Sequence, residues 1–310
     1  MTWREQQATI MTDKVSGAVD LTQATARMLL DLVVDQADKS VDELFASLRQ
    51  VGREILTAQS GMSSLVSLFN RVFFALSAEA DPDAVPLIVR ETVHAFLSEQ
   101  EAAQSALHRK AAALLPADVC VLTHSSSSTV YHTLLSARKA GRSPRVICLE
   151  ARPLYEGRQQ ATRLADSGIQ VTLIVDSAAY ANLEEVELVL VGADSLTEAG
   201  VVSKVGTAGL AVCAQSLGVP CYFLADTSKL WPAALGEQPI HERAPQDVWS
   251  DAPENVRVQN RFYDVTPWSA IAGVVTEHGL FSAEEVQSQS QSRPVHRLLQ
   301  DIVAEVRSTI

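Results

Sequence analysis

The chain has 310 residues, of which 47% are hydrophobic and 20% charged, a composition typical of a globular protein with one large or two modest domains. Its 37 acidic and 25 basic residues give a net charge of -12, which disfavours a broad contact with the nucleic-acid backbone, so any anion site must be local. The sequence has no apolar run of about 18 residues and no secretory signal, so we expect a cytoplasmic protein without membrane contact.

Cysteines and histidines do not form a metal-binding pattern. His124 and His132 lie eight residues apart without a cysteine or carboxylate cluster, which is not a zinc-ligand spacing. The cysteines stand in apolar stretches, where a free thiol behaves as a small core residue. We therefore expect reduced thiols, no metal and no cofactor. These cysteines are Cys120, Cys148, Cys213 and Cys221.

The first third of the chain is predicted to be a helical domain, residues 1–114. Apolar residues recur there at three- and four-residue spacing, and no strand pattern interrupts them. Ser40 and Glu43 form a capping box, and Asp81-Pro82-Asp83 precedes the last helix. The predicted helices cover residues 20–38, 41–59, 65–78 and 84–113.

Beyond Pro116 the hydrophobic period changes to short apolar runs that alternate with segments of helical length. This alternation predicts an α/β fold, in which the helical bundle is followed by a Rossmann-like, doubly wound parallel sheet at residues 115–310. The sequence after Pro232 has no regular hydrophobic pattern until its end, where two segments have helical spacing. The predicted strands are 119–122, 145–149, 171–175, 186–191 and 221–224, and the predicted helices are 127–140, 156–167, 177–183, 207–217, 283–291 and 295–308.

A hydroxyl-rich turn follows the first predicted strand. Ligands of open parallel sheets bind where the carboxyl ends of the strands meet, and the next helix begins here with unpaired N–H groups. The turn is therefore a predicted phosphate site. In the alternative interpretation, one serine caps the helix and the others are solvated. The residues are Thr123, Ser125, Ser126, Ser127 and Ser128.

Asp194 follows the fourth predicted strand, where burial can raise the pKa of a carboxyl enough for proton transfer. Alternatively, Asp194 only orders a turn. The next helix start offers a second place for phosphate, because it combines hydroxyls, a cation and a glycine that permits close approach. Its residues are Ser203, Lys204, Gly206 and Thr207.

The turn after the second strand carries Arg152, which can bind an oxyanion bidentately while Pro153 stiffens the loop. The alternative is an exposed Arg152 that pairs with Glu150. Asp176 lies where a strand meets a helix and is expected to act as a cap. A hydrolase is not favoured, because the adjacent His124 and Ser125 rarely orient as base and nucleophile, and no Gly-x-Ser-x-Gly motif occurs.

Taken in order, these turns resemble the superfamily that contains the alpha, beta and delta subunits of initiation factor 2B, methylthioribose-1-phosphate isomerase and ribose-1,5-bisphosphate isomerase. The similarity runs from about Val119 to Val286, and the first third agrees only in helical character and in Gly17-Ala18. The matching segments are Leu122–Val130 (Leu-Thr-His-x-x-Ser), Ala151–Gly157 (Ser-Arg-Pro and a glycine), Val191–Asp194 (Val-Gly-Ala-Asp), Ser203–Thr207 (Asn-Lys-Ile-Gly-Thr), Tyr263–Pro267 (Asp-x-Thr-Pro) and Val275–Gly279 (Thr-Glu-x-Gly).

The resemblance implies that a sugar phosphate or nucleotide binds in the crevice, with Gly17 and Ala18 beside it, and that the carboxy-terminal domain forms a homodimer or a higher homo-oligomer. In the isomerases a cysteine after Thr-His works with the carboxylate of Gly-Ala-Asp, and here Ser125 stands in its place. The pKa of a cysteine thiol is about 8.5, and the pKa of a serine hydroxyl is far higher. Ser203 replaces the isomerases' asparagine and Ser16 an arginine, which weakens tight bisphosphate binding.

These differences point first to an initiation-factor-2B-like regulatory protein that binds a phosphorylated ligand without cysteine-dependent isomerisation. The alternative is an aldose–ketose isomerase that acts on a ribose 1-phosphate derivative, with Asp194 as acid/base and Ser125 or water as proton relay. A third hypothesis, a partner in guanine-nucleotide exchange, rests on analogy, because the sequence carries no appended catalytic exchange domain.

Overall fold

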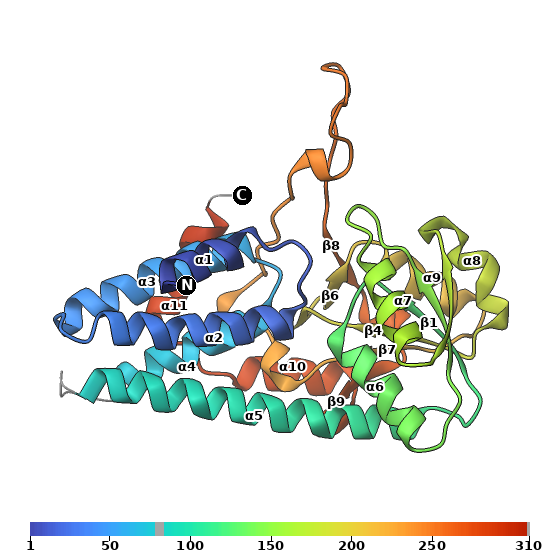
Figure 1. Ribbon diagram of the computed structural model, residues 1–310, viewed down its shortest axis with the longest axis horizontal. Coiled ribbons are helices and arrows are strands. Elements are labelled where there is room, and N and C mark those ends of the chain that lie inside the picture. Colours follow the sequence, from blue (N-terminus) through green and yellow to red (C-terminus); the bar gives the residue numbers. More distant parts are fainter. Residues whose placement is uncertain (78–83, 309–310) are drawn as a thin grey trace.

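The amino-terminal region is helical, as predicted, in a computed structural model that describes residues 1–77 and 84–308 (Figure 1). The capping box of Ser40 and Glu43 is confirmed, and a second one, Thr2 with Glu5, starts a helix that was not predicted separately. The segment Asp81-Pro82-Asp83 and the predicted helix end at Ala78 lie outside the described residues. The helices are α1 (Trp3–Thr12), α2 (Ala18–Asp35), α3 (Val41–Ala58), α4 (Ser63–Ser77) and α5 (Val85–Leu114).

The end of the chain returns to this bundle. Helix α11 (Arg297–Arg307) buries Leu299 and Ile302 in the same hydrophobic core as the amino-terminal helices, where it packs against α3 and α4. An ion pair of 2.7 Å between Arg49 and Glu305 joins the two parts at the surface. The predicted domain limit at residue 114 stays a prediction, but the core of the bundle contains residues from both ends of the chain.

The central sheet has the strand order β10-β9-β7-β4-β1-β2-β3, and its strands are parallel except β10. The five predicted strands are confirmed within a few residues, whereas β9 and β10 were missed in the irregular text after Pro232. The predicted fold class is therefore confirmed. The strands are β1 (Cys120–His124), β2 (Arg145–Leu149), β3 (Gln170–Ile174), β4 (Leu188–Gly192), β7 (Cys221–Leu224), β9 (Gly273–Thr276) and β10 (Gly279–Phe281).

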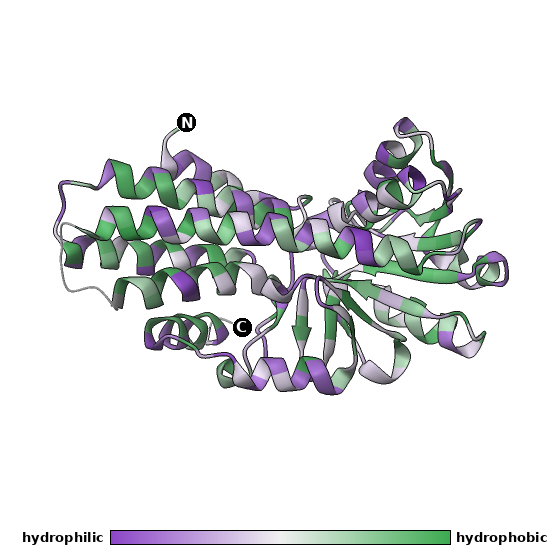
Figure 2. Ribbon diagram, turned by 90° about the horizontal axis from the view of Figure 1, so that it is seen from below, coloured by the Kyte–Doolittle hydropathy of each residue, from purple (hydrophilic) through white to green (hydrophobic). Residues whose placement is uncertain are grey.

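Helices cover both faces of this sheet. The carboxyl half of α5 packs on one face with α6 (Ser128–Lys139) and α7 (Glu156–Asp166), and α9 (Thr207–Ser216) and α10 (Ala283–Ser292) pack on the other. Figure 2 shows the hydrophobic colouring of the strands between these layers. The helix predicted at 177–183 is a series of short turns instead. These turns are η2 (Asp176–Ala178), α8 (Ala179–Asn182) and η3 (Leu183–Glu185).

A small antiparallel sheet, not predicted, joins the α/β part to the bundle. It consists of β5 (Ser195–Thr197), β6 (Gly200–Lys204) and β8 (Tyr263–Thr266). The buried hydroxyl of Ser195 accepts hydrogen bonds from the N–H and the hydroxyl of Ser63, at 3.0 and 2.6 Å, which fixes the start of α4. Short 3-10 turns complete the fold: η4 (Thr227–Lys229), η5 (Ala233–Leu235), η6 (Pro245–Asp247) and η7 (Trp268–Ala270).

Two general features can be stated for the part of the chain that the structure describes. None of its helices combines the length and apolar character needed to cross a bilayer, and its His, Cys, Asp and Glu side chains form no cluster able to hold a metal ion. The cysteine thiols are free, and burial raises the pKa of Cys148 and of Cys221 to about 12, which keeps both thiols protonated and unreactive.

Candidate functional site

The direction of the strand order reverses between β1 and β4. From β1 the chain continues outward to β2 and β3, whereas β4 continues to β7 on the other side, so the loops that follow β1 and β4 separate. Such a topological switch point is the usual ligand crevice of a doubly wound sheet. Here the Ser125–Ser128 turn follows β1, and Ala193 and Asp194 follow β4.

A cavity with about 440 Å³ of empty space, part of it open to solvent, lies at this switch point. The structure brings together most of the residues that the sequence pointed to, from both the α/β part and the bundle. The predicted residues on its wall are Gly17, Ala18, Ser125, Ser126, Ser127, Ser128, Asp194, Ser203, Lys204 and Thr207.

Two helices begin at this cavity. Helix α2 starts at Ala18 after Gly17, with no side chain capping its first N–H groups. Helix α6 is capped by Ser127, whose hydroxyl accepts a hydrogen bond of 3.3 Å from the N–H of Val130. The positive ends of both helix dipoles, together with their unpaired N–H groups, favour an anion. The Ser203 hydroxyl is also buried on this wall and has no partner among the described residues.

Asp194 places a carboxyl group on the same wall. Burial raises its pKa to about 6, although the nearby ammonium groups of Lys229 and Lys204 act in the opposite direction. Among residues 1–77 and 84–308, no group donates a hydrogen bond to this carboxyl, whereas its backbone N–H is fixed to the carbonyl of Val202 at 2.9 Å. Asp194 is thus held in place by its main chain, and its side chain is free to exchange a proton with a ligand.

Lys204 is less available to a ligand than its sequence position suggested. Its ammonium group lies 2.8 Å from Oε1 of Glu156, and both side chains are buried. The ammonium also lies 3.5 Å from the ring centroid of Phe262, a cation–π contact. Burial lowers the pKa of Lys204, and Glu156 opposes this shift. The positive charge of Lys204 is therefore balanced inside the protein.

The start of α9 was the second predicted phosphate site, and a carboxylate of the protein occupies it. Asp264 accepts hydrogen bonds from the N–H groups of Gly206, at 2.7 Å, and Ala208, at 3.2 Å. Thr207 donates its hydroxyl to the carbonyl of Lys204 at 2.5 Å. Gly206 keeps a φ of 99°, which favours glycine. Burial raises the pKa of Asp264 to about 6.

Arg152 makes its contacts away from the cavity wall. Its guanidinium donates to the carbonyl of Val248 at 2.7 Å and to the hydroxyl of Tyr155 at 3.0 Å, and it does not pair with Glu150. Asp176 was expected to act as a cap. Its carboxylate accepts hydrogen bonds from the backbone N–H groups of Ala151 and Arg152, each at 2.8 Å, and so fixes the loop after β2. An oxyanion contact for Arg152 stays a prediction.

Two residues of β1 support the site from behind. Thr123 is buried within the strand. His124 is also buried, its Nε2 lies 2.9 Å from the carbonyl oxygen of Val205, and burial lowers its pKa, so the ring is neutral at pH 7. A hydrogen bond to a carbonyl assigns the proton to Nε2. His124 therefore positions the β6–α9 loop and does not serve as the base for Ser125.

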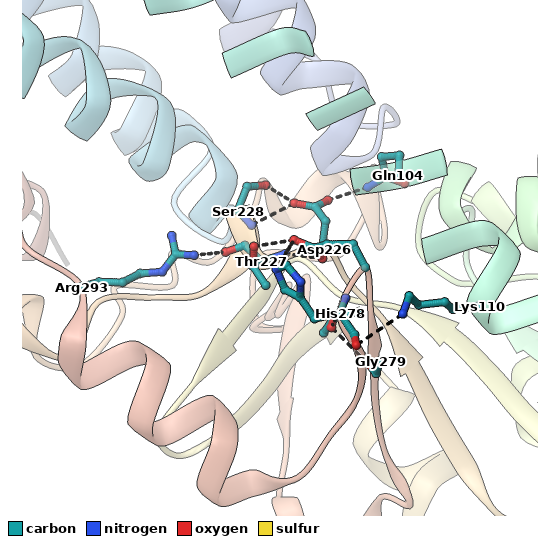
Figure 3. Close-up of polar contacts among 10 residues, drawn as sticks. Gln104, Lys110, Asp226, Thr227, Ser228, His278, Gly279 and Arg293 are labelled. Atoms are coloured by element: carbon teal, nitrogen blue, oxygen red, sulfur yellow. Dashed lines mark hydrogen bonds and ion pairs between the residues drawn. The ribbon is translucent and has the colours of Figure 1, made fainter. Parts of the chain in front are cut away.

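Lys229 lines the cavity but was not predicted. Its buried ammonium donates to the carbonyl of Ala193 at 2.6 Å, one residue before Asp194. The turn η4 that carries Lys229 is held by Asp226, which accepts hydrogen bonds from Ser228 and from Gln104 of α5 (Figure 3). A strand end followed by Asp-x-x-Lys was the only signal in the sequence.

The turn η4 is fixed from its other side as well. The carboxylate of Glu277 accepts the N–H of Thr227 at 3.1 Å, and Arg293 donates to the Thr227 carbonyl at 2.6 Å, a contact visible in Figure 3. Gln104 also accepts a hydrogen bond of 3.2 Å from the hydroxyl of Thr129 in the first turn of α6. One polar network thus connects η4, α5 and the α6 start.

Comparisons with known proteins agree with this fold. The model of the Initiation factor 2 subunit family matches residues 14–283. The chain is 30% identical to the ribose 1,5-bisphosphate isomerase of Methanocaldococcus jannaschii, over 89% of this chain and 90% of that protein. It is 32% identical to the 5-deoxyribose 1-phosphate isomerase of Moorella thermoacetica, over 86% and 82%.

A solved structure gives the same result. The translation initiation factor eIF-2B of Pyrococcus horikoshii superposes with a TM-score of 0.77 at 28% identity and covers 90% of this chain and 96% of its own. Both the family match and these identities extend over most of the molecule, including the bundle, where the sequence motifs were weak. The resemblance that the strand-end motifs indicated is confirmed, and the chain belongs to the Initiation factor 2 subunit family.

Proposed function

We propose that this protein is an aldose–ketose isomerase that acts on a ribose 1-phosphate derivative, with Asp194 as its acid/base group. The observation that carries the proposal is the place of the Asp194 carboxyl, which has a pKa raised to about 6 and lies on the wall of a cavity where α2 and α6 begin. Proton transfer at neutral pH requires a pKa close to neutrality. The two helix starts offer N–H groups to a phosphate.

The names of the relatives support the same class. The two relatives described above are named as isomerases of a ribose 1,5-bisphosphate and of a 5-deoxyribose 1-phosphate. We therefore place isomerisation ahead of regulatory binding as the proposed function. Assembly into a homodimer or a larger homo-oligomer belongs to this proposal as well.

The chemistry of the reaction explains why one carboxyl group is sufficient. In an aldose 1-phosphate, the bond between C1 and the ring oxygen breaks, and the hydrogen of C2 moves with its electron pair to C1. The C2 hydroxyl then loses its proton and becomes the ketone. A carboxyl that starts protonated can donate its proton to the ring oxygen, accept the proton of the C2 hydroxyl, and return to its first state. Asp194 has this role, and Ser125 on the same wall relays the proton.

A second candidate function is binding without turnover, as in a regulatory protein. Ser125 favours it, because a hydroxyl cannot supply the thiol chemistry that cysteine brings at this position. The same cavity would then sense a phosphorylated sugar or a nucleotide without converting it.

One experiment separates the two functions. The pure protein is incubated with methylthioribose 1-phosphate and with ribose 1,5-bisphosphate, ketose formation is followed by NMR, and binding is measured by calorimetry. Ketose formation that is lost in Asp194→Asn supports the isomerase. Binding with no ketose would refute the isomerase and leave the regulatory function.

A further inference from the structure

A second cavity shares part of its wall, including Asp194, with the first. We call the part between the α2 and α6 starts and Lys229 the phosphate chamber, and the part lined by Glu156, Arg243 and Tyr263 the far chamber. Asp194, Ser125, Ser126 and Lys204 line both. If the ribose 1-phosphate of the proposed function bound with its phosphate in the phosphate chamber and C1 beside Asp194, its C5 end would point toward the far chamber.

The cations of the far chamber already make contacts within the protein. Lys204 pairs with Glu156, and Lys14 pairs with Asp247, each at 2.8 Å. Arg243 lies close enough to Asp13 to act on its pKa, donates to the Gln59 side chain at 2.9 Å, and stacks at 5.0 Å from the centroid of the Phe262 ring. Among the described residues of this chamber, a second phosphate would therefore compete with these existing contacts of Lys204, Lys14 and Arg243.

Glu156 adds a specific feature. Its Oε2 atom is buried and accepts no hydrogen bond from the described residues, although Oε1 is paired with Lys204. The backbone that carries Glu156 is held close to β2, because a Cβ on the next residue, Gly157, would lie 1.7 Å from the carbonyl oxygen of Leu149. A buried carboxylate oxygen without a hydrogen-bond donor is energetically unfavourable. A ligand hydroxyl that donates to this oxygen would be stabilised, whereas a second anion would be repelled.

We propose that Glu156 makes the far chamber selective for an uncharged C5 end, so that the ligand is a ribose 1-phosphate derivative with a hydroxyl or apolar group on C5 and not a bisphosphate. Met62, Phe262 and Tyr263 line the same chamber and suit an apolar group. This inference rests on the proposed function, because it assumes that the ligand carries its phosphate on C1.

Calorimetry with two probes tests the proposal. Ribose 1-phosphate and ribose 1,5-bisphosphate are titrated into the wild-type protein, Glu156→Gln and Glu150→Gln. The wild type is expected to bind the monophosphate at least tenfold more tightly. Glu156→Gln, which keeps the shape and an acceptor for Lys204 but removes the negative charge, is expected to reduce this ratio at least fivefold. Glu150, which pairs with Arg158 at 2.8 Å on the same loop, is the matched control and should leave the ratio unchanged.

Each other result contradicts a defined part of the proposal. If the wild type binds the bisphosphate as tightly as the monophosphate, the proposed selectivity for an uncharged C5 end is wrong, while the proposed function stands. If the monophosphate is preferred but Glu156→Gln leaves the ratio unchanged, Glu156 is not the determinant. If neither sugar phosphate binds, the proposed function fails together with this inference.

Discussion

Gly192 and Ser127 meet across the switch point of the sheet: a Cβ on Gly192 would lie 2.5 Å from the Ser127 hydroxyl oxygen. Gly192 is the last residue of β4, and Ser127 caps α6 after β1. The glycine is needed here for close approach and not for a left-handed backbone. It allows the cap of α6 to lie directly against the strand that leads to Asp194.

We therefore expect Gly192→Ala to weaken the binding of a sugar phosphate at least tenfold, because the added methyl group displaces Ser127. Loss of a helix cap also costs about 0.5–2 kcal/mol of stability. Calorimetry and thermal unfolding measure the two effects. Gly209→Ala is the matched control: among the described residues, nothing beyond the backbone of its own helix lies within 4 Å of a Cβ there, and alanine within α9 should stabilise the fold by up to about 1 kcal/mol. An unchanged affinity in Gly192→Ala would show that Ser127 has no part in binding.

The raised pKa of Asp194 predicts that ligand binding takes up protons. At pH 7.5 a carboxyl with a pKa of about 6 is mostly ionised, and a bound phosphate dianion nearby raises that pKa further, so the complex is more protonated than the free protein. Calorimetry in two buffers of different ionisation enthalpy measures this uptake. Asp194→Asn should abolish the uptake. Equal uptake by both proteins would assign the proton to another group.

The same raised pKa affects stability with a defined sign. The folded protein holds the Asp194 proton more tightly than the unfolded chain, whose Asp pKa is about 3.9. The stability that this provides is full below pH 4 and is lost as the pH rises through about 6. Asp194→Asn should therefore stabilise the free protein relative to wild type at pH 8 more than at pH 5, as measured by urea unfolding. A difference independent of pH would contradict the assigned pKa.

The strand ends of a parallel sheet made much of this site predictable. Ser125–Ser128 and Asp194 each follow a short apolar run, and the topology of such a sheet brings those ends together whatever the loops contain. What stayed hidden depends on contacts between distant segments. Asp264 caps α9 from a strand that begins 56 residues after Thr207 and has no strong hydrophobic pattern.

Ion pairs between residues far apart in the chain could not be predicted from the sequence either. Lys204 looked like a phosphate ligand, because its partner Glu156 lies 48 residues earlier in the chain, in a turn that seemed to belong to Arg152. The place of α11 in the bundle could not be read either, since an amphipathic helix does not specify the surface against which it packs.

Ser125→Cys tests whether the serine limits catalysis. Ser125 has a φ of 65°, and its position lies on the wall shared by both chambers, so a thiol there would stand beside the reacting carbons. A thiol has a pKa of about 8.5, and positioned acid–base groups contribute about 10²–10⁴-fold to a rate. We expect ketose formation to rise at least tenfold by NMR, whereas Ser126→Cys, the matched control, should not increase it. No gain in Ser125→Cys would mean that the serine is not the limiting group.

Two glutamines one turn apart on α5 should respond in opposite ways to replacement by leucine. Gln104 joins Asp226 to Thr129 and so supports the turn that carries Lys229 (Figure 3), whereas neither polar atom of the buried Gln100 has a partner among the described residues. Removing a buried amide that is hydrogen-bonded leaves its partners unsatisfied, which costs about 1–3 kcal/mol. Removing a buried amide that has no hydrogen bond relieves a similar penalty.

We therefore expect Gln104→Leu to lower the free energy of unfolding in urea and to weaken sugar-phosphate binding, because Asp226 no longer holds η4 and the Lys229 ammonium leaves the Ala193 carbonyl. Gln100→Leu, with the same change of side chain on the same helix, should raise the free energy of unfolding and leave binding unchanged. If both variants lose stability equally, the loss reflects leucine packing in α5. If Gln104→Leu binds like the wild type, the network does not position Lys229 for the ligand.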